Sequence, residues 1–336
     1  MKRPRIKRLL QNLALSACSF LLCFFILEVI LRSAGYGNVE IYEADPVLYW
    51  KLKPNQVCYT KIDRKPVHIN SHGTRGADFE TVKPTNTLRV VSLGDSRTFG
   101  WGLAEAETYS GLLQSLLQDK GGSKKKVEVI NAGVNAWSYP QMHLYFRDYA
   151  LSYQPDYVIL GDANLWTQFS EKNSPEFVRK FMTRVRLKNF LRRFATYHYV
   201  VEVKLKEVYE RQRTKFIPID PKEDPFFKEQ QQKDPEGFFR HSIEALCQLA
   251  ISRGVRPILI YLPTVTELEQ KEPSSVLKAK RAVSQKLNVP LIEFTADFAP
   301  KGKALYLEGD AAHLNAEGNQ IVAHNLFKLM NALVTP

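Results

Sequence analysis

The run Leu88-Arg89-Val90-Val91-Ser92-Leu93-Gly94-Asp95-Ser96-Arg97-Thr98-Phe99-Gly100 decides the fold of this chain. Its first six residues are mostly Leu and Val, the pattern of a buried strand, and a helix-like stretch follows at residues 108–118. Ser96 therefore stands where a strand ends. In open α/β sheets the carboxyl ends of the strands are where ligands bind.

The same succession of strand and helix repeats along the chain. Further strands are expected at residues 127–130, 157–160, 257–261 and 291–294. Helices are expected at 108–118, 139–153, 237–253 and 274–287, and a last one runs from its N-cap, Asn315, toward Leu333. Residues 131–133 are expected to form a loop. Strands that alternate with helices predict a flavodoxin-like three-layer α/β sandwich with a parallel sheet of about five strands.

The amino-terminal end has the features of a membrane anchor. Residues 13–31 are nearly all apolar, close to the roughly 20 residues that span a bilayer, and five basic residues precede them. This charge predicts a cytoplasmic amino terminus and an extracytoplasmic remainder. We expect an uncleaved signal-anchor, because no A-x-A-like cleavage site follows the run. A lipoprotein-like box at Leu15-Ser16-Ala17-Cys18 is the alternative, although the apolar run continues past Cys18.

These features divide the chain into four parts. Residues 1–32 form a basic tail and transmembrane helix, residues 33–87 an irregular lead-in, and residues 88–335 the main domain, with an insertion at about 165–236. For the insertion we consider three structures. They are a helix packed on the domain with a solvated basic face, an amphipathic helix on anionic lipid, and a lid over the active site.

The net charge of +12 does not indicate a nucleic-acid-binding protein. Part of the excess precedes the apolar run, and most of the rest lies in residues 172–215, which hold thirteen Lys or Arg and four Glu. No helix-turn-helix, zinc-finger or RNA-binding signature accompanies these residues. We therefore expect a membrane as a partner and no nucleic acid.

The four cysteines provide no metal signature, because no CxxC or Cys/His cluster occurs. Cys18 and Cys23 lie in the apolar span. Cys58 and Cys247 lie in the exported part, where a Cys58–Cys247 disulfide is allowed, and a buried free thiol at Cys247 is the alternative. We expect neither a metal nor a cofactor.

A second chemically informative stretch, Asp310-Ala311-Ala312-His313, lies near the carboxyl terminus. A serine hydroxyl is a poor nucleophile until a base takes its proton and a third group orients that base. Ser96, His313 and Asp310 suit these three roles, and Asp95 is expected to organise the serine loop. The three candidates also have structural interpretations: Ser96 as a helix N-cap, His313 as a loop histidine and Asp310 as a turn residue.

The position of Thr98 disfavours the G-x-S-x-G elbow, which would have a glycine there. Instead, the Gly-Asp-Ser block, the later Gly133 and the terminal Asp-x-x-His resemble the GDSL/SGNH hydrolase family over residues 88–330. The lead-in run Asn70-Ser71-His72-Gly73-Thr74-Arg75-Gly76 and the apolar span resemble the membrane-anchored bacterial members of that family.

The resemblance implies an SGNH hydrolase fold with Ser96 as nucleophile, His313 as general base and Asp310 as its orienting group. It also implies an oxyanion hole formed by the backbone N–H groups of Ser96 and Gly133 and by an asparagine side chain. The family pattern Gly-x-Asn-Asp would place that asparagine at position 163, but the chain reads Gly161-Asp162-Ala163-Asn164. Asn164 is therefore the candidate, with a one-residue shift.

The expected function is that of a serine esterase in the bacterial inner membrane, with its catalytic domain on the periplasmic side. Its expected substrate is an acyl ester, in particular an O-acetyl group on a cell-surface or exported glycan, cleaved through an acyl-enzyme. An O-acyltransferase that uses the same triad is one alternative. A non-catalytic SGNH-like module for glycan binding or assembly is the other.

Overall fold

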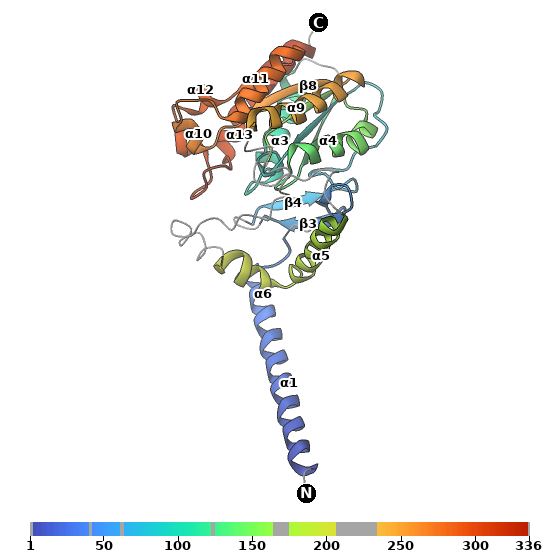
Figure 1. The fold of residues 1–336 in the computed structure, drawn as a ribbon, viewed down its shortest axis with the longest axis vertical. Helices are drawn as coiled ribbons and strands as arrows, with labels where there is room; N and C mark the ends of the chain where they lie inside the picture. Colours follow the sequence, from blue (N-terminus) through green and yellow to red (C-terminus); the bar gives the residue numbers. More distant parts are fainter. Residues whose placement is uncertain are drawn as a thin grey trace.

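The computed structural model describes residues 3–39, 42–60, 64–121, 125–163, 175–205 and 234–334. A long helix, α1 (Arg3–Ser33), extends away from the rest of the chain, which folds around a β-sheet (Figure 1). Residues Lys7–Ser33 of this helix are long and apolar enough to cross a membrane, although a signal sequence has the same properties.

The central sheet has five strands in the order β6-β5-β7-β8-β9, and every neighbouring pair is parallel. Its strands are β5 (Thr87–Gly94), β6 (Lys126–Gly133), β7 (Tyr157–Leu160), β8 (Arg256–Tyr261) and β9 (Leu291–Glu293). All five expected strands are present. Residues 131–133 extend β6 instead of forming a loop, because they pair with residues 92–94 of β5.

Helices cover both faces of the sheet, as expected for a three-layer sandwich. They are α3 (Tyr109–Lys120), α4 (Tyr139–Asp148), α9 (Pro235–Ser252), α11 (Ser275–Leu287) and α13 (Ala316–Val334). Side chains of β5 alternate between two buried clusters. Val91 and Leu93 pack with α4, α9 and α11, and Leu88 and Val90 pack with α3 and α13. Asn315 caps α13, because its Oδ1 accepts a hydrogen bond from the Gly318 amide at 3.0 Å.

Short helical elements complete the main domain. They are α2 (Ser96–Phe99), α10 (Val265–Glu269), α12 (Thr295–Phe298) and the 3₁₀ turns Glu105–Glu107, Ala150–Tyr153 and Gly302–Leu305. The turn at Ala150–Tyr153 falls inside the helix expected over 139–153. That helix is broken at Tyr149, whose φ of −127° is not helical.

The lead-in contains two antiparallel β-hairpins, so the expectation of an irregular segment was wrong. The first pairs β1 (Tyr42–Asp45) with β2 (Tyr49–Leu52), and the second pairs β3 (Gln56–Tyr59) with β4 (Pro66–Ile69). The indole N–H of Trp137 donates to the carbonyl of Trp50 at 2.9 Å. The first hairpin therefore shares a core with the main domain.

Arg75 fixes the lead-in to the turn that follows β5. It is 3% exposed, and its backbone N–H donates to Asn131 of β6 at 2.9 Å. Its guanidinium donates to the carbonyls of Phe99 and Gly100, each at 2.8 Å, and to that of Leu103. The first two carbonyls lie at the C-terminal end of α2 and the third lies in the turn that follows, so Arg75 acts as a C-terminal cap from a distant segment.

The described part of the insertion packs at the α1 end of the molecule (Figure 1). It comprises α5 (Pro175–Leu191), α6 (Ala195–Tyr197) and a π-helix (His198–Leu205). The ring of Phe181 lies 5.9 Å from that of Tyr49 and 5.3 Å from that of Trp50. Helix α5 is therefore a helix packed on the domain, and it covers the first hairpin.

Cys58 and Cys247 are both buried, and no disulfide joins them. Cys58 lies in β3 and Cys247 in α9, where burial raises the pKa of its thiol to about 12. Cys18 lies on the exposed surface of α1, and its lipidation stays the alternative to the expected uncleaved anchor.

Replacing Arg75 with Ala is expected to lower the free energy of unfolding by about 3 kcal/mol or more, because three backbone carbonyls lose a buried cationic donor. Urea denaturation of the full chain in detergent measures this change. Arg281→Ala is the matched control, since the Arg281 side chain is 49% exposed and its pair with Glu293 is superficial. The control should change stability by less than about 1 kcal/mol. Equal losses in the two variants would contradict the capping role.

Candidate active site

Ser96 stands at the turn from β5 into α2, as its first helical residue. The N-cap is Asp95, whose Oδ1 accepts a hydrogen bond from the Arg97 amide at 2.9 Å. The helix ends at Gly100, whose φ of 85° is the left-handed conformation that glycine adopts without strain. Asp95 therefore organises the serine loop, and the N-cap role considered for Ser96 belongs to Asp95.

The fold brings Ser96, His313 and Asp310 into one hydrogen-bonded chain. The Ser96 Oγ lies 2.7 Å from Nε2 of His313, and Nδ1 of the same ring lies 2.7 Å from Oδ2 of Asp310. Ser96 and His313 are separated by 217 positions in the sequence. In this arrangement a base contacts the hydroxyl and a carboxylate orients the base, which is the geometry that activates a serine.

Asp310 holds both the turn and the ring. Its Oδ1 accepts hydrogen bonds from the amides of Ala312 at 2.7 Å and His313 at 2.9 Å, while its Oδ2 faces the imidazole. Burial alone would raise the pKa of this carboxyl, but the hydrogen bond and charge of His313 and the two amides lower it well below its usual range. The turn aspartate and the group that orients the base are thus the same residue.

The expected oxyanion donors differ in their placement. As the first residue of α2, Ser96 has a backbone N–H without an acceptor inside the helix. The Gly133 amide already donates to Oδ1 of Asn131 at 3.0 Å. A Cβ on Gly133 would lie 2.3 Å from the Phe99 backbone nitrogen, so this glycine permits close packing of α2 on β6. Asn164 lies outside the described residues.

A buried network of charged side chains stabilises the loop that carries Ser96. Arg97 bonds Asp95 through Nη2 at 2.9 Å, and its Nη1 lies 3.8 Å from Oδ2 of Asp162. Oδ1 of Asp162 accepts from the ammonium of Lys280 at 2.6 Å, and its Oδ2 accepts from the Leu262 amide at 2.6 Å. The network thus joins α2 to the ends of β7 and β8 and to α11.

Burial and charge act in opposite directions on these cations. Burial would lower the pKa of Arg97, but Asp95 and Asp162 raise it above its usual value. Lys280 is 0% exposed, and burial lowers its pKa although Asp162 favours the charged form. Since an unpaired charge is costly at such depth, each member depends on its partners.

Sequence reasoning missed Asp162 and Lys280, but one of them left a signal. Lys280 lies on the apolar face of α11, in helical register with Val276, Leu277 and Val283, all of which are buried. A lysine at such a position requires an internal carboxylate. Asp162 carries no comparable signal, because an acidic residue after a strand reads as part of a loop.

Two further residues near the site were also missed. The ring of Trp101 lies 5.8 Å from the ring of His313 and forms an aromatic wall beside it. Ala136, in the loop after β6, has a φ of 65°, a left-handed conformation that costs a non-glycine residue roughly 1–2 kcal/mol. Both lie at the carboxyl edge of the sheet, where Ser96 also lies.

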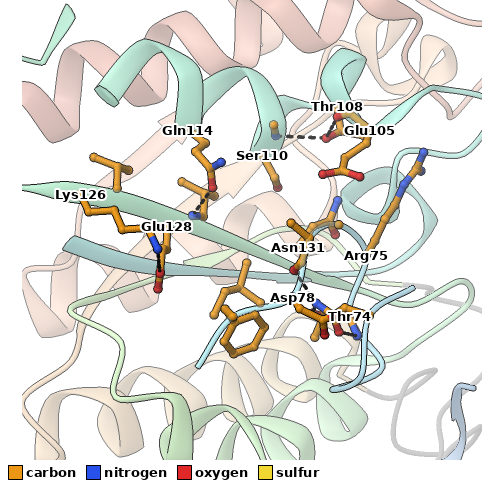
Figure 2. Close-up of a pocket in the computed structure, with 18 residues that line it drawn as sticks. Thr74, Arg75, Asp78, Glu105, Thr108, Ser110, Gln114, Lys126, Glu128 and Asn131 are labelled. Atoms are coloured by element: carbon orange, nitrogen blue, oxygen red, sulfur yellow. Dashed lines mark hydrogen bonds and ion pairs between the residues drawn. The ribbon is translucent and has the colours of Figure 1, made fainter. Parts of the chain in front are cut away.

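A separate hollow of about 170 Å³ lies at the outer edge of β6, against α3 and the end of the lead-in (Figure 2). Ser96 and His313 do not line it. Gln114 of α3 spans part of it, and its Oε1 accepts from the Val129 amide at 2.8 Å (Figure 2). Gln118 bonds the Val127 amide in the same way at 2.8 Å, so these side chains satisfy an edge strand.

Within the described ranges, no group of three or more His, Cys, Asp or Glu side chains is placed to hold a metal ion.

Residues 92–321 match the sequence profile of the GDSL-like Lipase/Acylhydrolase family. No curated protein matches the chain by sequence similarity.

Several solved structures are similar to this chain. The lipase/acylhydrolase from Enterococcus faecalis is 16% identical, with a TM-score of 0.47 over 74% of this chain and 98% of that one. The acetyl xylan esterase AlAXEase is 19% identical, with a TM-score of 0.43 over 72% and 99%. The psychrotrophic esterase EstA from Pseudoalteromonas sp. is 13% identical, with a TM-score of 0.44 over 74% and 99%.

The lowered pKa of Asp310 predicts how the stability of the protein depends on pH. A carboxyl whose pKa is lower in the folded state than in the unfolded state stabilises the fold at pH values above its ordinary pKa, 3.8. It loses this contribution as the pH falls below that value. The difference in unfolding free energy between the natural chain and Asp310→Asn should shrink as the pH falls below about 4, where the Asp310 carboxylate takes up a proton. Denaturation at several pH values measures it, and a difference that grows on acidification would contradict the prediction.

Replacing Lys280 with Met is expected to cost about 3–5 kcal/mol of stability, because Asp162 keeps a buried charge and loses its closer cation. Adding Asp162→Asn should recover part of that loss, since both charges are then absent. Urea denaturation of the single and double variants measures both effects. Lys286→Met, on the exposed side of the same helix, is the control and should cost less than about 1 kcal/mol. A double variant less stable than Lys280→Met alone would contradict this account.

Proposed function

The chain belongs to the GDSL-like lipase/acylhydrolase family and is a serine ester hydrolase; from this premise we propose that Ser96, His313 and Asp310 are its catalytic triad. The observation that carries the proposal is the pair of 2.7 Å contacts that join Ser96 to His313 and His313 to Asp310. Both contacts form between side chains that the serine-hydrolase reaction requires in that order.

In the proposed reaction, Nε2 of His313 takes the Ser96 proton as Oγ attacks the ester carbonyl. Asp310 accepts a hydrogen bond from Nδ1, which keeps that proton on Nδ1, and its negative charge stabilises the imidazolium. The ester C–O bond then breaks as His313 returns the proton to the leaving alcohol, which leaves an acyl group on Ser96. Water then attacks the acyl carbonyl as the same nitrogen takes its proton. The bond between the acyl carbon and Oγ breaks, and Nε2 returns the proton to Oγ, which releases the acid and restores the serine.

The oxyanion needs hydrogen-bond donors near the attacked carbon. We propose the Ser96 amide as one donor, because it is a helix N-terminal N–H next to the nucleophile. Gly133 and Asn164 remain proposals as the other two. For Gly133, the hydrogen bond to Asn131 would have to open before its amide faced an oxyanion. A single such donor is commonly worth roughly 3–4 kcal/mol.

We further propose that α1 anchors the enzyme in the bacterial inner membrane, with the catalytic domain on the periplasmic side. The basic residues before the apolar run support this orientation. An O-acetyl ester on a surface or exported glycan is the proposed substrate, and this choice rests on the proposed location and on the family to which the chain belongs. Trp101, beside His313, provides a flat surface on which a sugar ring packs.

A serine-directed fluorophosphonate should label the full chain, and Ser96→Ala should abolish both the labelling and the hydrolysis of an aryl acetate. The expected loss in kcat is on the order of 10⁴-fold or more, since the nucleophile itself is removed. Ser115→Ala is the matched control, because its hydroxyl is exposed and bonds only to its own helix at Gly111. Labelling that persists in a folded Ser96→Ala protein would contradict the assignment of the nucleophile.

A second assay, with an acetylated oligosaccharide as substrate, separates hydrolysis from the alternatives. With an acetylated oligosaccharide, an esterase releases acetate in step with loss of the ester. A transferase would instead move the acetyl group to a second oligosaccharide, with little free acetate. A non-catalytic module would bind the oligosaccharide without either product and without labelling at Ser96.

A further inference from the structure

The end of α1 is joined to the insertion by buried polar contacts. Glu28 is 8% exposed, and its carboxylate accepts from the Ala195 amide at 2.8 Å and the Thr196 amide at 3.0 Å. Arg32 pairs with Glu28 at 2.7 Å and donates to the carbonyl of Arg193. Helix α6 is therefore held at the level of Glu28 on α1.

The position of Glu28 also marks where a bilayer would end. A hydrocarbon core takes roughly 20 residues of helix. Twenty residues counted from Leu9, which follows the basic cluster, end at Glu28, and the apolar run 13–31 ends three residues later, within one helical turn. If α1 spans the membrane as proposed above, α6 and the adjoining end of α5 lie at the membrane surface.

Exposed apolar side chains gather at this level. In α5, Val178, Phe181 and Val185 face the core, whereas Leu187 and Phe190 lie on the opposite side, 58% and 54% exposed. The π-helix adds exposed Val200, Val201 and Leu205. We call the segment 187–205 the foot.

Aromatic rings make the foot continuous with the apolar surface of α1. The ring of Phe190 lies 5.6 Å from that of Phe194, and the ring of Phe194 lies 5.9 Å from that of Phe24. Phe24 belongs to the proposed transmembrane run. Because these rings connect α1 with α5, the exposed side of the foot continues the surface that contacts lipid.

The charge of the insertion suits an anionic membrane. Residues 175–205 hold eight Lys or Arg and two Glu. Both acids are paired, Glu176 with Lys180 at 2.7 Å and Glu202 with Arg192 at 2.8 Å. Arg186 and Arg193 are exposed beside the apolar residues. A cationic rim around exposed Leu, Phe and Val is the pattern of an interfacial helix on acidic phospholipid.

We propose that the foot lies in the headgroup region of the leaflet at the C-terminal end of α1. Leu187 and Phe190 lie at the boundary with the acyl chains, and Arg186 and Arg193 bind lipid phosphates. The partner is the anionic phospholipid surface itself. This inference rests on the proposed membrane anchoring and is independent of the esterase chemistry. Its consequence is a fixed orientation of the catalytic domain over the membrane, since a foot and a span together prevent rotation about α1.

Spin labels on the full chain in nanodiscs test the proposal. Cys18 and Cys23 are replaced by Ala, while Cys58 and Cys247, 1% and 0% exposed, are too buried to react. A label at Leu187→Cys in phosphatidylglycerol and phosphatidylethanolamine should collide more with oxygen, which partitions into lipid, than with a water-soluble nickel chelate. In pure phosphatidylcholine the preference should shift toward the chelate. Arg186→Gln with Arg193→Gln should produce the same shift in the anionic nanodiscs.

Two control positions fix the scale and separate the possible failures. Phe20→Cys reports the interior of α1, and Leu333→Cys reports the far end of the molecule, near the carboxyl terminus (Figure 1). A Leu187 label that behaves like the Leu333 label in both lipids, with Phe20 in lipid, overturns the foot and leaves the anchor intact. A Phe20 label open to the chelate overturns both. A Leu187 label immobilised and closed to oxygen and chelate alike indicates a protein contact and also overturns the proposal.

Discussion

The backbone of α2 lies directly on the ends of β5 and β6, and the arrangement of the site depends on that contact. A Cβ on Gly94 would lie 1.9 Å from Oγ1 of Thr98, and one on Gly133 would lie 2.3 Å from the Phe99 nitrogen. These two glycines are partners in the strand register. Because both positions are glycines without a side chain, α2 can lie directly against the sheet. Ser96 is thereby placed at the sheet's edge.

Contacts from distant segments keep α2 in that place. Arg75 of the lead-in binds the carbonyls at its far end, and Asn131 of β6 donates to the Thr98 carbonyl at 3.0 Å. Arg97 and Asp95 connect its first turn to Asp162 and so to Lys280. Most of these groups fix the position of α2 and do not contact the serine hydroxyl. The lead-in is therefore part of the structure that supports the site.

The accuracy of the sequence analysis followed the strength of each local pattern. Strands β5, β7 and β8 of the sheet were recognised because strands buried on both faces form nearly continuous apolar runs. The hairpins of the lead-in were missed, since short strands such as Tyr42–Asp45 lack the continuous apolar run that revealed the equally short β7. Gly133 was expected to provide an oxyanion amide, and in the structure it allows close packing of α2 on β6 while its amide donates to Asn131.

By itself, the sequence determined the α/β class, the apolar amino-terminal helix and the residue types needed for serine chemistry, because each depends on local composition or spacing. Only the tertiary structure decided that Ser96 and His313 lie 2.7 Å apart, that Asp95 and not Ser96 caps α2, and that Lys280 neutralises Asp162. Those outcomes depend on contacts between segments far apart in the chain. Such contacts arise when the sheet and its helices exclude water, and no local pattern encodes them.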